Sequence, residues 1–382
     1  MTKIQKDNKN VAKFPNLRFP EFTEEWETKK LGEIGEIVNG LTYSPNDIAE
    51  NGVLVLRSSN VQNRSLAFED NVYVRTDNYN PVQENDILIC VRNGSKNLIG
   101  KNALINKENE GVAFGAFMSI YRSSFNTFLF HWFDTNEYKE IVYKNLGATI
   151  NSINGSDLRK FKVPFPSIEE QKKLASFLSI VDERIQTQNK IIEELKLLKI
   201  TLRYQLYEQI LNHENEYVQV KDALNYEQPT KYLVTNTDYS SDISLIPVLT
   251  ANKAFVLGYT DEEFGIYDKG QCIIFDDFTM DIKFVNFPFK VKSSAIKILT
   301  AKPNVNLKFI FEYLLFLNLS SNEHKRHYIS EIETMEMQLP NYIQQTYVAD
   351  FLASIDNKIK NEFEIHTLLL KQKQYLLANL FI

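Results

Sequence analysis

Two stretches of the chain carry the same pattern of hydrophobic and polar positions. In residues 166–206 and 340–380, apolar residues recur at alternating spacings of three and four. Neither proline nor glycine interrupts 167–212 or 341–382. Sustained heptads of this kind predict two helices of about 40 or more residues each, which form a coiled coil.

The seam of this coiled coil is mostly apolar, and its polar positions indicate how the helices pair. A parallel pair would place Lys199 against Lys373, whereas an antiparallel pair can place Lys199 opposite Glu362 and Gln188 opposite Lys373. We therefore predict an antiparallel pair; the alternative is that these long side chains extend into solvent. The seam comprises Leu178, Val181, Ile185, Gln188, Ile192, Leu195, Lys199 and Leu202 in the first copy, and Leu352, Ile355, Ile359, Glu362, His366, Leu369, Lys373 and Leu376 in the second.

The two copies share more than their apolar spacing. At an offset of 174 residues, PSIEEQKKLASFLSIVDERI (166–185) matches PNYIQQTYVADFLASIDNKI (340–359) at a proline, a glutamine and an aspartate as well as at apolar positions. Heptads alone do not require those residues, so duplication is the better explanation.

Each copy also begins with a capping signal. Ser167 with Glu170 three residues later fits a reciprocal capping box, and Asn341 with Gln344 holds the same places in the second copy. Both helices are therefore predicted to begin directly after a proline.

The segments before the two helices differ in sequence but share an order of predicted elements. Each contains a β-like run that leads into a polar bend, two further strands, and an aromatic-rich helix, at 125–146 and 306–319 respectively. We predict an α+β fold: two globular mixed α/β domains separated by an antiparallel two-helix coiled coil, with a pseudo-two-fold internal repeat. The predicted parts are a disordered tail (1–16), a first domain (17–160), a first repeated helix (161–212), a second domain (213–334) and a second repeated helix (335–382).

Composition narrows the function classes. The chain is 43% hydrophobic and 24% charged, which is typical of globular proteins, and its net charge of −6 gives no support to nucleic-acid binding. Cys90 and Cys272 each lie in an apolar run, which indicates buried thiols and no disulfide framework. No stretch is long enough to span a membrane, and the N-terminus lacks the apolar core of a signal peptide, so we expect a cytoplasmic protein without a membrane partner.

No motif predicts catalysis or a cofactor. GSKNLIGK (94–101) resembles a phosphate loop, but the spacing is one residue too long and asparagine follows the last lysine. Asp276, Asp277 and Asp281 form an acidic cluster that is more typical of a carboxylate-rich turn than of a metal site. The five histidines lack metal-ligand spacing with the cysteines. We predict no catalytic residue, no metal and no cofactor.

The alternation of variable segment and repeated helix resembles the specificity subunit of type I restriction–modification enzymes. The resemblance rests on the two helix starts quoted above and on PNLRFPEFTEEWETKKLGEI (15–34), which is similar to the start of many such subunits. It implies that the two globular domains are target-recognition domains, each reading one half of a bipartite, asymmetric DNA site. It also implies that the chain is not an enzyme and that its partners are double-stranded DNA, two methyltransferase (modification) subunits and the restriction/translocase subunits.

On this interpretation the polar bends of the two domains carry the DNA-reading residues. Arginine and lysine suit guanine edges, and asparagine and glutamine suit adenine edges. For any single residue the alternative is an ordinary solvated turn residue, so the bends are stronger candidates as a set than one by one. The candidates are Arg57, Ser58, Ser59, Asn60, Gln62, Arg64, Arg92, Asn93, Ser95 and Lys96 in the first domain, and Thr250, Asn252, Lys253, Tyr259, Thr279 and Lys283 in the second.

A second interpretation comes from another class of protein. A coiled-coil adaptor whose two globular ends bind proteins would fit the acidic balance of the chain. The duplicated polar bends and the sequence motifs at the helix starts favour the specificity subunit instead.

Overall fold

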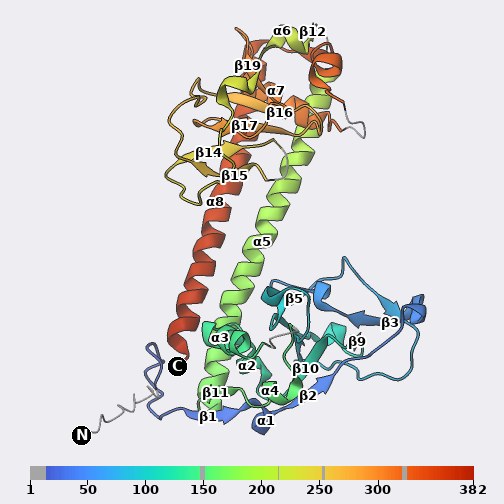
Figure 1. The fold of residues 1–382 in the computed structure, drawn as a ribbon, viewed down its shortest axis with the longest axis vertical. Coiled ribbons are helices and arrows are strands. Elements are labelled where there is room, and N and C mark those ends of the chain that lie inside the picture. Colours follow the sequence, from blue (N-terminus) through green and yellow to red (C-terminus); the bar gives the residue numbers. More distant parts are fainter. Residues whose placement is uncertain (1–13, 147–150, 214, 252–253, 321–324) are drawn as a thin grey trace. The chain divides into compact units, whose positions relative to one another are not determined.

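The computed structural model describes residues 14–146, 151–213, 215–251, 254–320 and 325–382. The chain divides into two compact units: unit 1 comprises Met1–Gln188 and Ile365–Ile382, and unit 2 comprises Asn189–Glu364. Each unit contains one globular domain and one part of each long helix, α5 (Ile168–Leu211) and α8 (Tyr342–Leu380) (Figure 1).

The globular domain of unit 1 is built on an antiparallel four-stranded sheet of order β2-β10-β7-β8. In a second sheet, β6-β3-β9, β3 runs antiparallel to β6 and parallel to β9. The smaller pairs are β1-β11 and β4-β5. The strands are β1 (Glu27–Lys30), β2 (Glu36–Asn39), β3 (Ile48–Leu56), β4 (Val61–Gln62), β5 (Ser65–Leu66), β6 (Tyr73–Val74), β7 (Ile87–Cys90), β8 (Asn102–Leu104), β9 (Ala113–Phe114), β10 (Met118–Arg122) and β11 (Lys162–Phe165). The helices are α1 (Leu31–Ile34), α2 (Asn126–Trp132), α3 (Asn136–Lys144) and α4 (Gly155–Leu158), with the short turns η1 (Pro45–Asp47), η2 (Ser58–Asn60), η3 (Lys96–Leu98) and η4 (Lys107–Asn109).

The globular domain of unit 2 has the same sheet plan. Its four-stranded antiparallel sheet has the order β13-β19-β16-β17, and in β15-β14-β18 the central strand is again antiparallel to one neighbour and parallel to the other. The strands are β12 (Glu216–Gln219), β13 (Leu224–Glu227), β14 (Ile246–Leu249), β15 (Val256–Thr260), β16 (Cys272–Asp276), β17 (Ile282–Val285), β18 (Lys290–Val291), β19 (Ile296–Ala301) and β20 (Glu336–Leu339), of which β12 pairs with β20. The helical elements are α6 (Val220–Ala223), η5 (Pro229–Tyr232), α7 (Leu307–Phe316) and the π-helical turn η6 (Tyr328–Ile332). The duplication read from the helices therefore extends to the sheets.

The aromatic-rich helix of the first domain differs from its prediction. A single helix over 125–146 was expected, but the structure has two, α2 and α3, separated at residues 133–135. Thr135 causes the break, because its Oγ1 accepts a hydrogen bond from the backbone N–H of Tyr138 at 3.2 Å and so caps α3. In the second domain the predicted helix is present as α7.

The two long helices run antiparallel within each unit. In unit 1, Leu174 and Leu178 at the start of α5 share a core with Leu377 and Leu380 at the end of α8. In unit 2 the end of α5 shares a core with the start of α8, where Leu352 is fully buried. Each of the predicted seam residues is buried or half-buried.

The polar seam contacts are not the predicted ones. In unit 2, Lys199 Nζ lies 2.6 Å from Asp356 Oδ1 and 2.8 Å from Glu312 Oε1, so Glu362 is not its partner. In unit 1, Lys373 Nζ lies 2.6 Å from Asp182 Oδ1 and 2.7 Å from an oxygen of Asp134, and the predicted contact with Gln188 is replaced. Each lysine contacts one carboxylate of the other long helix and one of a globular domain, and the helix pattern does not reveal the second.

Both helix starts use their caps, but among the described residues neither cap is reciprocal. Ser167 Oγ accepts from the backbone N–H of Glu170 at 3.4 Å, and Asn341 Oδ1 accepts from that of Gln344 at 3.0 Å. The Glu170 carboxylate does not return to the cap. It accepts hydrogen bonds from Arg18 (2.8 and 2.7 Å) and from Trp26 Nε1 (3.1 Å) instead.

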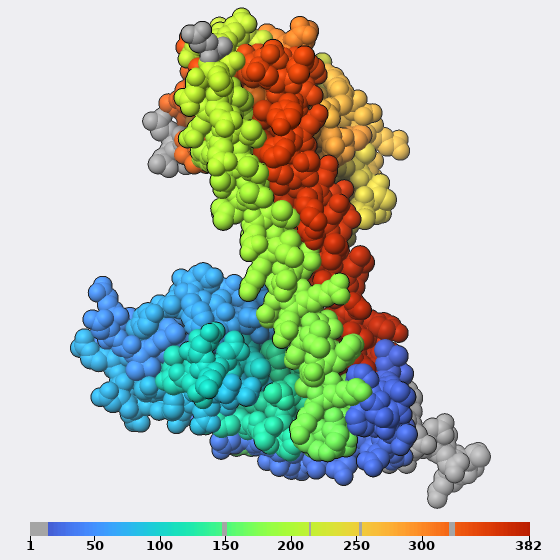
Figure 2. Space-filling model, turned by 180° about the vertical axis from the view of Figure 1, so that it is seen from behind, coloured from blue at the N-terminus to red at the C-terminus, as the bar shows by residue number. Residues whose placement is uncertain are grey.

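An N-terminal segment, residues 14–25, lies against the start of α5 and the end of α8 in unit 1 (Figure 2). Asn16 Nδ2 donates to Asn379 Oδ1 at 3.3 Å, and Phe19 packs edge-on to Phe177 with ring centroids 5.9 Å apart. Of the tail predicted to be disordered, residues 1–13 lie outside the described residues, whereas 14–16 are held in place.

Two expectations from composition can be compared with the fold. Cys90 and Cys272 are both buried free thiols, as predicted, on the equivalent strands β7 and β16. Among the described residues, none of the helices is both long and apolar enough to cross a membrane.

Candidate nucleic-acid interface

The structure brings the two predicted bends of the first domain together. Residues 57–66 follow β3 and include η2, and residues 91–97 follow β7. Asn93 Nδ2 donates to Ser58 Oγ at 2.8 Å and joins the two bends. Candidates that are far apart in sequence therefore form one surface.

Arg92 is the most accessible arginine on this surface. Its side chain is exposed, and its guanidinium lies 5.6 Å from the ring centroid of Phe117. Phe117 is itself 56% exposed and accepts hydrogen bonds from the backbone N–H groups of Val91 and Arg92. An exposed aromatic ring beside an arginine can stack on a base, so Phe117 joins the candidates. Phe117 lies directly before β10, which begins at Met118.

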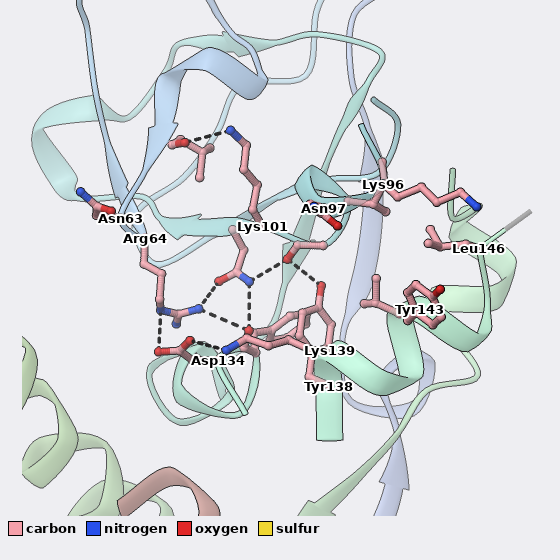
Figure 3. A pocket seen from close by; sticks show the side chains of 16 residues that line it. Asn63, Arg64, Lys96, Asn97, Lys101, Asp134, Tyr138, Lys139, Tyr143 and Leu146 are labelled. Atoms are coloured by element: carbon pink, nitrogen blue, oxygen red, sulfur yellow. Dashed lines mark hydrogen bonds and ion pairs between the residues drawn. The ribbon is translucent and has the colours of Figure 1, made fainter. Parts of the chain in front are cut away.

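Two of the first-domain candidates serve the fold. Asn60 is fully buried and accepts from the backbone N–H of Arg57 at 2.9 Å while it donates to the carbonyl of Ala67 at 2.9 Å. Arg64 Nη1 (Figure 3) donates to Asn102 Oδ1 at 2.7 Å. Its guanidinium also lies 3.9 Å from the ring centroid of Phe130. Donors already bonded inside the domain are not available to a base edge.

The remaining first-domain candidates vary in exposure. Arg57 is half-buried and forms an ion pair with Asp70 at 2.9 Å. Ser59 is half-buried, and Gln62, Ser95 and Lys96 are exposed. The accessible donors of this surface are therefore those of Gln62, Arg92, Ser95 and Lys96.

The described second-domain candidates lie on or beside different strands. Thr250 is buried just after β14, and Tyr259 is half-buried within β15. Thr279 is exposed in the turn between β16 and β17, where its Oγ1 donates to Asp281 Oδ2 at 3.0 Å, and Lys283 is half-buried on β17. Asn252 and Lys253 lie outside the described residues.

The acidic cluster beside Thr279 is a folded turn. Asp276 Oδ1 accepts from the backbone N–H groups of Phe278 and Thr279, each at 3.0 Å. Asp277 is buried, with its carboxylate 3.2 Å from Lys297 Nζ and bonded to the backbone N–H of Tyr328 at 2.9 Å. In the described part of the chain no group of three or more potential ligands could hold a metal ion.

Several known proteins are similar to this chain in sequence or in fold. The model of the type I restriction modification DNA specificity domain matches residues 23–197. The EcoR124I/EcoR124II specificity subunit of Escherichia coli is 44% identical over 133 residues, 33% of each chain. The putative type I restriction enzyme MjaX specificity subunit of Methanocaldococcus jannaschii is 23% identical over 394 residues, 91% of this chain and 90% of the relative. The crystal structure of the S subunit of a type I restriction–modification system from M. genitalium has a TM-score of 0.61 at 16% identity, over 97% of this chain and 99% of that one.

Residues 23–197 therefore match a type I restriction modification DNA specificity domain, and the chain as a whole is similar to the specificity subunits of type I restriction–modification systems. It spans only a third of the length of the Escherichia coli subunit in that match, but nine-tenths of the archaeal one. The predicted fold class, with long repeated helices and β-rich domains, is confirmed. The interpretation as a non-DNA adaptor is not favoured.

The long helices α5 and α8 also carry exposed apolar side chains. Within unit 1 these include Ile180 on α5 and Tyr375 on α8, and within unit 2 they include Leu197, Ile343 and Tyr347. Apolar residues repeated along exposed helix faces are typical of surfaces that bind another protein.

Proposed function

We propose that the chain reads a bipartite, asymmetric DNA sequence, one half with each globular domain. The observation that carries the proposal is that both domains use one sheet plan while their bends carry unlike polar side chains. A common scaffold with different loops suits two readers of different sequences. The proposed target-recognition domains are 17–160 and 213–334.

The repeated helices are proposed to set the distance between the two half-sites. A continuous helix of 44 residues is about 66 Å long at 1.5 Å per residue. Half-sites one turn of the duplex apart lie about 34 Å from centre to centre, and two linked readers gain affinity only when their spacing fits. The ion pairs of Lys199 with Asp356 and of Lys373 with Asp182 support a fixed register of the two helices within each unit.

We further propose that the helices bind two methyltransferase subunits, that restriction/translocase subunits join that complex in the cytoplasm, and that the chain itself catalyses nothing. The exposed apolar residues of α5 and α8 support protein docking there. Partner subunits would also supply basic side chains that contact DNA phosphates. Such contacts contribute much of the affinity for DNA, and this acidic chain has no excess of basic residues.

The proposal is tested by co-expressing the chain with methyltransferase subunits and sequencing the methylated genome. We expect methylation confined to one split sequence with a constant gap. Methylation that is absent with every active methyltransferase partner, or that follows a single uninterrupted sequence, would contradict it.

Replacing Arg92 with alanine is expected to weaken binding to the cognate sequence by about 1–3 kcal/mol if the guanidinium contacts a base edge. Relaxed methylation at one position of the site would accompany the loss. Binding is measured by fluorescence anisotropy over a range of salt concentrations, because a phosphate contact would instead reduce the salt slope by about one.

Arg159→Ala is the matched control, since Arg159 is an exposed arginine at the end of α4 in the same domain. It should bind as the unaltered chain does. If Arg92→Ala also keeps its affinity and methylates the original sequence, Arg92 does not read DNA.

A further inference from the structure

A pocket of about 320 Å³ lies within unit 1 (Figure 3). Its walls come from the turn between β4 and β5, from the GSKNLIGK stretch (94–101), and from α3 with the residues just before it. The first of these walls includes Asn63 and Arg64, and the second includes Lys96, so the pocket adjoins the predicted reading bends.

The pocket is rich in positive charge although the chain is acidic. Four cationic side chains line it, and Asp134 is the one carboxylate among its lining residues. That carboxylate is already engaged, because it lies 3.4 Å from Arg64, 3.4 Å from Lys139 and 2.7 Å from Lys373. The pocket therefore has an excess of positive charge that its own residues do not neutralise.

Lys101 is a half-buried cation of the pocket without an anionic partner among the described residues. Its Nζ donates to the carbonyl of Val61 at 3.0 Å, and no carboxylate of the described residues forms an ion pair with it. Burial lowers the pKa of its ammonium group, as expected where a charge lacks an anionic partner. A bound anion would supply that partner.

The rest of the pocket suits a flat ring. Tyr138 and Val142 are buried in its floor, and Tyr143 stands at the rim with 72% of its surface exposed. Among the described residues the side-chain amides of Asn63 and Asn97 have no hydrogen-bond partner, so they remain available as donors and acceptors. Apolar floor, aromatic rim and polar amides together match a nucleobase attached to a phosphate.

We propose that this pocket binds a nucleotide, with its phosphate against Lys101 and its base over Tyr138 and Val142. The nucleotide is either one residue of a DNA strand or a free mononucleotide. In the first case the inference rests on the proposed function, and in the second it stands without it. GSKNLIGK thus contributes side chains to a nucleotide site without forming a phosphate loop.

The test titrates the full-length chain with inorganic phosphate, with each deoxynucleoside monophosphate and with duplex DNA, by calorimetry. We expect Lys101→Met to weaken nucleotide binding about ten- to a hundredfold, because a charge-assisted hydrogen bond is lost. Tyr143→Ala should weaken binding of nucleotides but not of inorganic phosphate. Lys107→Met removes an exposed lysine of the same domain outside the pocket and should bind as the unaltered chain does.

The outcomes separate the two sources of the ligand. If mononucleotides bind and Lys101→Met weakens that binding, the ligand is a free mononucleotide. This conclusion holds whether or not the chain reads a bipartite DNA sequence. The ligand is a nucleotide of a DNA strand if the chain binds DNA but no mononucleotide. In that case Lys101→Met, and Lys96→Ala at an exposed lysine, should both weaken DNA binding. Two results would overturn the inference. In the first, the variants bind every ligand as tightly as the unaltered chain does. In the second, the chain prefers inorganic phosphate to nucleotides, and Tyr143→Ala does not change that preference.

Discussion

Replacing Glu312 with leucine is expected to lower the free energy of unfolding of unit 2 by about 3–5 kcal/mol. Glu312 is fully buried on α7, and its carboxylate lies 2.8 Å from Lys199, 2.8 Å from Arg203 and 3.2 Å from Lys308. Without it, Arg203 loses its charge partner in a buried position, and Lys199 and Lys308 retain Asp356 alone. Removing one member of a buried ionic cluster leaves the others desolvated without compensation.

The loss is measured by hydrogen exchange of α7 under increasing urea, which reports unit 2 directly. Glu336→Gln, which alters an exposed glutamate on β20 of the same unit, should change the unfolding free energy by less than about 0.5 kcal/mol. Adding Arg203→Met to Glu312→Leu should restore part of the loss, because an apolar pair leaves fewer charges buried. Equal stability of Glu312→Leu and the control would show that the cluster does not hold α7 to the helices.

The residues that are identical in the two helix copies could be recognised from the sequence as more than heptad positions. The duplicated lysine and aspartate form the same ion pair twice, Lys199 with Asp356 and Lys373 with Asp182, each at 2.6 Å. The sequence showed that the lysine and the aspartate are duplicated, but it did not show that they pair with each other. The partners could not be predicted because each lysine also meets a carboxylate of a globular domain, whose position depends on the tertiary fold.

The duplicated proline and glutamine have an equally local explanation. Gln171 Nε2 donates to the carbonyl of Pro166 at 2.8 Å, and Gln345 does the same to Pro340 at 2.8 Å. This bond satisfies the carbonyl of the proline that lies just before each helix. Duplication thus kept the residues that define where the helix begins.

The candidate site was predictable as a set of bends but not residue by residue. Asn60 and Arg64 have the same residue types as true base readers, yet their donors satisfy carbonyl and amide oxygens of the domain. Phe117 escaped notice because exposure of an aromatic residue beside a strand is not encoded in hydrophobic periodicity. A bend can be predicted from its amino-acid composition. The direction of each side chain in the bend depends on contacts with residues that are distant in sequence.

Replacing Asp134 with asparagine is expected to lower the free energy of unfolding of unit 1 by about 3 kcal/mol at neutral pH. Burial acts to raise the pKa of Asp134, but Arg64 and Lys373 outweigh burial and hold that pKa below its ordinary value. Urea unfolding followed by tryptophan fluorescence measures the effect, since the chain's two tryptophans, Trp26 and Trp132, are both buried in unit 1. Asp77→Asn, an exposed aspartate of the same domain, is the control and should change the unfolding free energy by less than about 0.5 kcal/mol.

The pH dependence of the Asp134 effect has a definite sign. A carboxylate whose pKa is depressed by folding contributes its full stability above its unfolded pKa, and that contribution is lost as the pH falls through its folded pKa. The difference between the unaltered chain and Asp134→Asn should therefore be constant from about pH 7 to about pH 5 and narrow below the ordinary value of 3.8. A difference that widens on acidification would mean that the Asp134 carboxylate is not the ionised partner of Arg64 and Lys373.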